Sequence, residues 1–409
     1  MEVRKRRYVV DYDKMAWIVT TALLLSFFVF MTEDYGKYIY LLLSFIMVVL
    51  SILKHGGSLF VGRTPYIIVS VCYILFLLAS AIWAYNPMYA LISARTTTMS
   101  CFYSFSVYLY YRDQESIEPL LNAVIVAGVI VALETIRRVG LGNLILMGIN
   151  GTRLLNEYFI NVNVISMTCA YAIVNVFFRF RRDKNIAWII LVLPMVVVWV
   201  VTGSKKGLIL PFLMIAVFFM FQSRRNMKRL FKNIIVIVIC SAVVLAILYY
   251  IPFSSEFVNR TFDFLFEFFG ADSLNESDML RKNMIVYGIQ QFLESPILGI
   301  GAGNAVYVGK RITGTEVYLH NNYVELLASI GLVGMLIYYL YYMIPLNSLR
   351  KDRDDEYSWI CLSILVTNLV MDFATVSVGD RENYFYLVIV FLQCEHIKSN
   401  KRLRKREII

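Results

Sequence analysis

The chain has 409 residues, of which 59% are hydrophobic and only 17% are charged. An ordinary soluble domain has about 25% charged residues, and the mean hydropathy of this chain is +0.65. The composition excludes a soluble enzyme, a disordered protein and a disulfide scaffold, and indicates a polytopic membrane protein. Its six cysteines are scattered, mostly in apolar runs and without paired spacing, as is typical of small buried residues and not of disulfides or metal ligands.

Apolar stretches long enough to cross a bilayer follow one another along the chain. A crossing helix needs about 20 mostly apolar residues. We therefore expect an all-α integral membrane protein with about twelve transmembrane helices. The candidate spans lie near 15–31, 38–53, 66–84, 88–111, 118–136, 162–180, 186–202, 207–222, 233–251, 318–345, 357–377 and 383–397.

The basic residues predict the orientation. Loops rich in Lys and Arg lie on the cytoplasmic side of a membrane, and an orientation with both termini inside places the main basic runs there. Those runs also account for the net charge of +10. Because they flank spans and have no aromatic interleaving, we expect no nucleic-acid binding. The runs are at 4–7, 179–184, 223–229, 350–353 and 401–406.

One connection is much longer than the others and divides the chain into three parts. Residues 1–251 contain nine spans, 252–317 form an outer loop, and 318–409 contain three spans and a basic tail. Within the loop, the aromatic-rich segment 256–269 is typical of an interfacial helix. Ser277 and Asp278 predict the start of a second helix, which Ser295-Pro296 ends after about Glu294. No internal repeat with a fixed period is visible.

Polar residues gather near the predicted outer ends of the spans, where ionisable side chains mark function by default. Each also has a structural interpretation. Arg95 would snorkel to the surface or pair with Glu134, and Arg153 would be an ordinary loop charge. Asp372 would join packed helices. The outer group comprises Arg95, Glu134, Arg153, Asn163, Lys205, Lys206, Arg281, Lys282, His320, Asn321, Asn322, Glu325, Asp372, Asp380 and Arg381.

Three histidines are too few and too far apart for a metal site, and we expect neither a metal nor another cofactor. His55 and His396 fall on the predicted cytoplasmic side. Only His320 falls outside, next to Asn321 and Asn322. A neutral imidazole can take a proton from a hydroxyl near neutral pH, so His320 is the candidate base.

The string GIGAGN at 299–304 is similar to a nucleotide-binding loop. It does not follow a strand of a βαβ unit, and it lies on the predicted outer face, so we reject that function. Glycines directly after Pro296 predict a tight loop below the active face.

Two longer strings carry a family resemblance. SPILGIGAGN at 295–304 and LHNNYVELLASIGLVG at 319–334 resemble the signature region of the O-antigen ligase and Wzy-type polysaccharide polymerase superfamily. TGSKKG at 202–207 resembles its second motif, and GTR at 151–153, with Asn161 and Asn163, is a weaker third match.

The resemblance implies a GT-C-like glycosyltransferase in the bacterial cytoplasmic (inner) membrane. It implies metal-independent, inverting transfer of an undecaprenyl-diphosphate-linked glycan to a sugar hydroxyl on the outer face. By the same resemblance, His320 activates the acceptor, and Arg281 and Ser204-Lys205 contact the diphosphate. The family usually has Arg where this chain has Lys205, and lysine lacks the bidentate fork. Lys206 would then share the role, or the contact would move to Arg153 and Arg95.

The residues support the same chemistry without the resemblance. A diphosphate leaving group needs cations where negative charge develops, and with no metal cluster in the sequence Arg and Lys must supply them. Together with the roles that the resemblance implies, this leads us to expect that His320 and Arg281 are catalytic and that Lys205, Lys206, Arg153 and Arg95 bind diphosphate. The expected substrate contacts are Asn163, Ser204, Asn321, Asn322 and Glu325.

These features favour a polymerase that joins lipid-linked repeat units into an O-antigen, capsule or exopolysaccharide. Its expected partners are the lipid-linked glycan and the bilayer, with a flippase and a chain-length regulator as further candidates. The alternative is a ligase that moves the glycan to lipid A core, protein or a wall polymer. A secondary transporter is the third hypothesis, but such folds show repeats and keep their ionisable residues near the midplane.

Overall fold

The computed structural model describes residues 11–29, 36–57, 64–150, 162–224, 226–250, 276–351 and 355–407. All regular elements in these ranges are helices, as the apolar runs predict. The first part contains α1 (Tyr12–Val29), α2 (Gly36–Lys54), α3 (Pro65–Ala79), η1 (Ser80–Ile82), α4 (Pro87–Tyr111), α5 (Glu118–Val139) and α6 (Leu141–Asn150). After it come α8 (Val162–Asp183), α9 (Ala187–Val201), α10 (Lys205–Ser223), α11 (Met227–Tyr249), α13 (Glu276–Glu294), α14 (Val306–Thr313), α15 (Asn322–Leu349), α16 (Glu356–Met371) and α17 (Arg381–Glu407).

Among the described residues, five helices are long and apolar enough to cross a membrane. They are Pro65–Ile82, Glu118–Val139, Val162–Asp183, Lys206–Ser223 and Asn322–Leu349. Three shorter apolar helices add to them, at Tyr38–Lys54, Ala187–Val201 and Glu356–Met371. The chain is a membrane protein, and both the total of twelve spans and the three-part division at 251 and 317 stay predictions.

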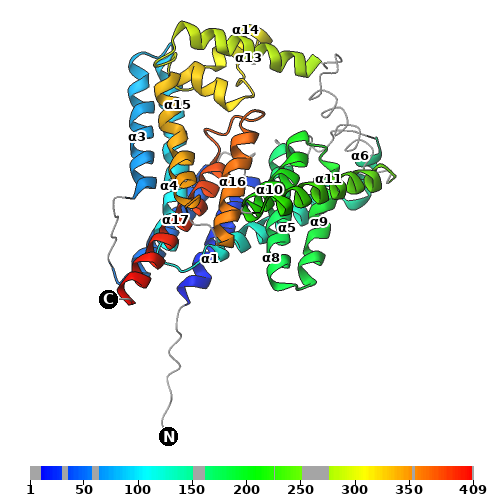
Figure 1. Ribbon diagram of the computed structural model, residues 1–409. Helices are drawn as coiled ribbons and strands as arrows, with labels where there is room; N and C mark the ends of the chain where they lie inside the picture. The colour runs from blue at the N-terminus through cyan, green and yellow to red at the C-terminus, as the bar shows by residue number, and fades with distance from the viewer. Residues whose placement is uncertain are drawn as a thin grey trace.

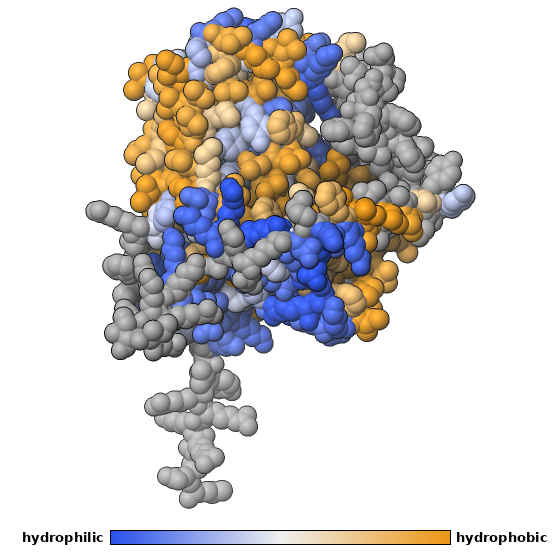
Figure 2. All heavy atoms as spheres, in the orientation of Figure 1, coloured by the Kyte–Doolittle hydropathy of each residue, from blue (hydrophilic) through white to orange (hydrophobic). Residues whose placement is uncertain are grey.

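The helices form one bundle with a cap at one end. α13 and α14 lie across the end of the molecule opposite the start of α1 and the end of α17 (Figure 1). A large buried cluster joins the helices of the bundle, and a smaller one lies beneath the cap. Hydrophobic residues cover much of the flank, while hydrophilic residues gather towards the end with the termini (Figure 2). The second buried cluster comprises Met284, Ile300, Ala305, Val308, Leu319, Val324 and Ala328.

The cap contains the predicted second loop helix. α13 runs from Glu276 to Glu294, which agrees with the helix expected to end before Ser295-Pro296. Its buried side packs on α15, because a Cβ on Gly288 would lie only 2.3 Å from the Val324 side chain. The aromatic-rich segment 256–269 lies outside the described residues.

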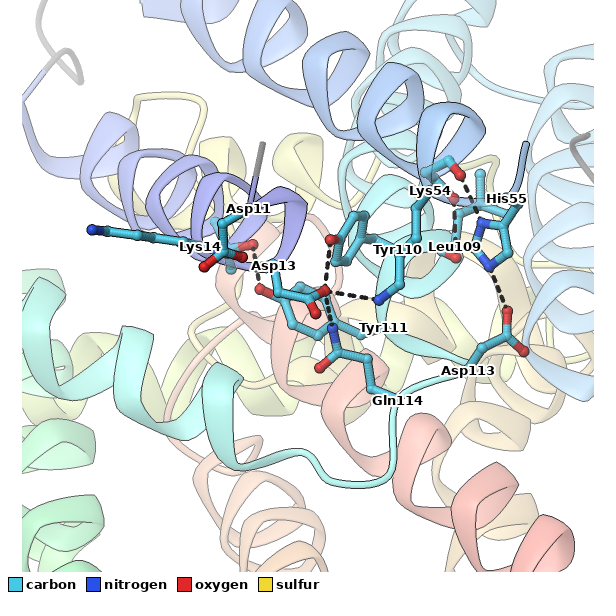
Figure 3. Close-up of polar contacts among 12 residues, drawn as sticks. Asp11, Asp13, Lys14, Lys54, His55, Leu109, Tyr110, Tyr111, Asp113 and Gln114 are labelled. Carbon is cyan, nitrogen blue, oxygen red and sulfur yellow. Dashed lines mark hydrogen bonds and ion pairs between the residues drawn. The ribbon is translucent and has the colours of Figure 1, made fainter. Parts of the chain in front are cut away.

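At the opposite end, polar side chains join α1, α2 and α4. Oδ1 of Asp13 accepts hydrogen bonds from Lys54 Nζ at 2.8 Å, Tyr110 Oη at 2.7 Å and Gln114 Nε2 at 3.0 Å (Figure 3). Because three donors from α2 and from the end of α4 meet at one carboxylate oxygen of α1, this cluster ties the three helices together.

Two of the histidines belong to this end of the bundle. His55 places Nε2 2.9 Å from Oδ2 of Asp113 (Figure 3). His396 is buried, with Nε2 3.3 Å from the carbonyl oxygen of Tyr111. The His55 contact joins the ends of α2 and α4, and the His396 contact joins α17 to the end of α4, so both histidines link helices of the bundle.

Candidate active site

The turn between α9 and α10 explains three residues of the TGSKKG motif, Gly203, Ser204 and Gly207. Gly203 has φ +54°, a left-handed conformation that glycine adopts without strain. Ser204 caps α10 by accepting a hydrogen bond from the N–H of Gly207 at 3.3 Å, and its hydroxyl donates to Oδ1 of Asn163 at 2.7 Å. A Cβ on Gly207 would lie 1.9 Å from Oγ of Ser166. Only glycine therefore lets α10 pack this closely on α8.

This turn brings Lys206 into the site. Lys206 lies within electrostatic range of Arg281 on α13 and of Asp380 before α17. The sequence left open which lysine replaces the usual arginine, and the structure places Lys206 beside the second expected cation. Lys205 begins α10; its side chain lies outside what the structure describes, and so does Arg153.

His320 lies in the connection from α14 to α15, two residues before α15 begins. It has φ +57°, a left-handed conformation that costs a residue with a Cβ roughly 1–2 kcal/mol. Strain of this kind gathers at functional sites. The imidazole packs against the ring of Tyr318, with centroids 4.4 Å apart. Among the described residues no hydrogen-bond partner of the imidazole is found.

Burial and two cations keep the imidazole neutral. Partial burial, followed by the positive charges of Arg281 and Lys206, lowers the pKa of His320 to about 4. The ordinary histidine pKa is about 6.5, so the ring is a free base at neutral pH. A neutral base beside two cations suits a reaction that takes a proton from one group while a second, anionic group leaves.

Two neighbours hold the His320 turn. Asn321 caps α15 by accepting from the N–H of Val324 at 3.1 Å. Glu325, 6% exposed, reaches back from the first turn of α15 and accepts from the N–H of Leu319 at 2.8 Å. Both side chains make structural hydrogen bonds here. The substrate contacts expected of them stay predictions.

Asn322 and Asp372 fasten the same turn to the connection between α16 and α17. Asn322 is fully buried, and its Nδ2 donates to Oδ2 of Asp372 at 3.1 Å. Its Oδ1 accepts from the N–H of Ser377 at 3.0 Å and of Val378 at 3.1 Å. Asp372 Oδ2 also accepts from Tyr339 at 2.9 Å. The substrate contact expected of Asn322 remains untested, and Asp372 joins packed helices as its structural interpretation predicts.

Sequence reasoning gave Asp380 and Arg381 no role, although both border the site. Burial raises the pKa of the Asp380 carboxyl to about 6, against the opposing charge of Lys206. Arg381 lies over the ring of Tyr40, 3.9 Å from its centroid, and Arg95 is within electrostatic range of the same hydroxyl. The predicted role of Arg95 in diphosphate binding stays a prediction. Its alternative partner, Glu134, instead binds Arg137 and Arg138.

Residues 295–304, which include the glycine-rich loop, pack as a wedge into a break in α15. α15 breaks at Gly331, which has φ +62° and ψ −169°. The loop enters the break, where Leu332 N–H donates to the carbonyl of Pro296 at 2.9 Å. On its other side, Asn304 Oδ1 accepts from the N–H of Asn86 at 2.8 Å. The loop therefore joins α15 to the start of α4, as expected of a tight loop.

Comparison with known families adds an independent observation. Residues 164–339 match the O-antigen ligase family. The resemblance predicted from the motifs is confirmed over this segment. It contains Lys206, Arg281 and His320, the three residues that the structure brings together, whereas Arg95 and Asp380 lie outside it. A search of curated proteins finds no match. This match and the apolar helices together support a membrane enzyme that transfers glycans.

Proposed function

We propose that the protein is a polysaccharide polymerase that joins undecaprenyl-diphosphate-linked oligosaccharide repeat units on the outer face of the cytoplasmic membrane. The observation that carries the proposal is the neutral His320 beside Lys206 and Arg281. A base next to two cations matches transfer from a diphosphate-linked donor to a hydroxyl acceptor.

In the proposed step, His320 takes the proton of the acceptor hydroxyl. The acceptor oxygen attacks the anomeric carbon of the donor glycan, forming the new glycosidic bond. The bond from that carbon to the lipid diphosphate breaks, and undecaprenyl diphosphate leaves with the electron pair. Attack from the side opposite the leaving group inverts the anomeric configuration. Arg281 and Lys206 stabilise the charge that develops on the leaving diphosphate.

The wider set of cations extends the proposed donor site. Arg95 and Arg381 lie near Tyr40. Arg381 directly follows Asp380, whose carboxyl lies within electrostatic range of Lys206. We assign Arg95 to diphosphate binding together with Lys205, Lys206 and Arg153. Ser204 and Asn163 support that region by fixing the start of α10 through their mutual hydrogen bond.

A ligase is the second candidate, favoured by the description of the matched family, O-antigen ligase. Both functions use the same donor and base and differ only in the acceptor. Purified protein in nanodiscs, supplied with the lipid-linked repeat unit, separates them on a gel. A ladder formed from the repeat unit alone supports the polymerase. If glycan moves only after a lipid A core, protein or wall acceptor is added, the protein is a ligase and the polymerase proposal is wrong.

A further inference from the structure

A groove with a volume of about 280 Å³ lies between α1, α5 and α9. It is at the end of the bundle where α5 and α9 begin, whereas Lys206 follows the other end of α9. Asn122 and Ile130, both on α5, line it and are separated along that helix by about 12 Å. The walls are apolar or aromatic except at Asn122; they include Trp17, Val126, Val129, Trp188 and Leu191.

Two buried polar atoms at or next to the groove lack hydrogen-bond partners in the described part of the chain. They are Oδ1 of Asn122 and Nε of Arg179. Arg179 stacks on Trp188, whose ring lines the groove, at 5.2 Å from its centroid. Arg179 also pairs with Glu118, one helical turn before Asn122. One unpaired acceptor therefore belongs to a residue of the groove wall, and one unpaired donor belongs to a residue stacked on Trp188 of that wall. Buried polar groups are normally paired.

The charges around Arg179 restrict the occupant. The ion pairs here join three guanidinium groups with three carboxylates, so they balance. A ligand with a large net charge would disturb that balance. The missing partners are a donor for Asn122 and an acceptor for Arg179, and the groove below them suits a hydrocarbon chain. The paired residues are Arg179, Arg181 and Arg182 with Glu118, Asp183 and Glu356.

We propose that this groove is a binding site for a zwitterionic aminophospholipid such as phosphatidylethanolamine. One acyl chain lies along α5 between Trp17 and Leu191. The ammonium group donates a hydrogen bond to Oδ1 of Asn122, and the phosphate accepts one from Nε of Arg179. In the predicted topology this lipid belongs to the cytoplasmic leaflet, on the opposite side from the glycan site. The inference does not depend on the proposed polymerase function.

The test is native mass spectrometry of the full-length protein after detergent exchange and addition of defined lipids. We expect wild-type protein to retain phosphatidylethanolamine in preference to phosphatidylcholine, whose quaternary headgroup has no N–H donor. Val126→Trp fills the groove and should remove the bound lipid. The matched control Val71→Trp changes a residue of α3 that is 49% exposed, and it should retain the lipid.

Asn122→Leu tests the headgroup contact, and it provides a second test if Val126→Trp does not fold. It keeps the groove apolar but removes the acceptor, so affinity for phosphatidylethanolamine should fall roughly tenfold, while phosphatidylcholine retention stays unchanged. Size-exclusion chromatography and thermal melting confirm folding. Equal retention of the two lipids by wild type, preference for phosphatidylglycerol, or full retention by a folded Val126→Trp protein would overturn the proposal.

Discussion

The carboxylate of Glu325 accepts a hydrogen bond from the backbone N–H of Leu319 at 2.8 Å, and this bond spans the residue that carries the candidate base. Leu319 is fully buried, so its N–H has no water to replace the carboxylate. The Glu325 side chain therefore holds His320 in its left-handed conformation from the first turn of α15.

Glu325→Ala should disable the site through this turn. The lost bond leaves a buried N–H unpaired, which costs about 1.5–3 kcal/mol in the free energy of unfolding. We expect kcat for glycan transfer to fall much more than KM changes, because His320 loses its orientation. Glu325→Gln keeps an acceptor oxygen and should restore most of the rate. A rise in KM alone, equal in both variants, would instead support the substrate contact expected from the sequence.

The pH dependence of transfer should reflect the lowered pKa of His320. The base is active when neutral, and its pKa is about 4, so kcat/KM should hold from pH 7 to about 5 and fall only towards pH 4. Removing a nearby positive charge raises a histidine pKa. The residual activity of Arg281→Gln should therefore fall at a higher pH, closer to 6.5.

Asp380 supplies the control for that profile, since its own pKa is about 6. Any change near pH 6 that disappears in Asp380→Asn belongs to this carboxylate. Suppose instead that kcat/KM of the wild type falls below pH 6.5, that this fall persists in Asp380→Asn, and that it does not move in Arg281→Gln. This result would contradict the assignment of His320 as a base whose pKa is lowered by two cations.

Gly331→Ala should loosen the wedge between the cap and the bundle. An added Cβ would lie 2.4 Å from the carbonyl oxygen of Ile297, and φ at this position is +62°. The strained conformation alone costs about 1–3 kcal/mol, so the melting temperature in detergent should drop clearly. Gly142→Ala on α6 is the control, because a Cβ there meets nothing within 4 Å. Equal melting of both variants would argue against the wedge.

Asn322→Ala separates a structural role from a substrate contact. The side chain makes hydrogen bonds to Asp372, Ser377 and Val378, and its loss leaves several buried groups unpaired. We expect destabilisation by about 2–3 kcal/mol, seen as a lower melting temperature without substrate. Asn143→Ala, which removes one local bond to the carbonyl of Val139, should melt close to wild type. A normal melting temperature with weakened donor binding would favour direct contact.

The sequence predicted an all-helical fold, because apolar runs of this length form helices. It also predicted that His320 lies at the opposite end of the bundle from His55 and His396, because the order of the spans decides this. It could not decide between Lys205 and Lys206. That choice depends on where α10 begins and on the approach of α13. The burial of Asn322 and the proximity of Asp380 to Lys206 arise from packing between segments distant in the chain, which local patterns do not encode.

The most direct test of the proposed chemistry measures ladder formation in nanodiscs by wild type, His320→Ala, Arg281→Ala and Lys282→Ala. Lys282 is the next residue on α13, exposed like Arg281. We expect the ladder to vanish in His320→Ala, to slow by about 10²–10³-fold in Arg281→Ala, and to persist unchanged in Lys282→Ala. A ladder that survives in folded His320→Ala protein at the wild-type rate would contradict the role of this histidine as the base.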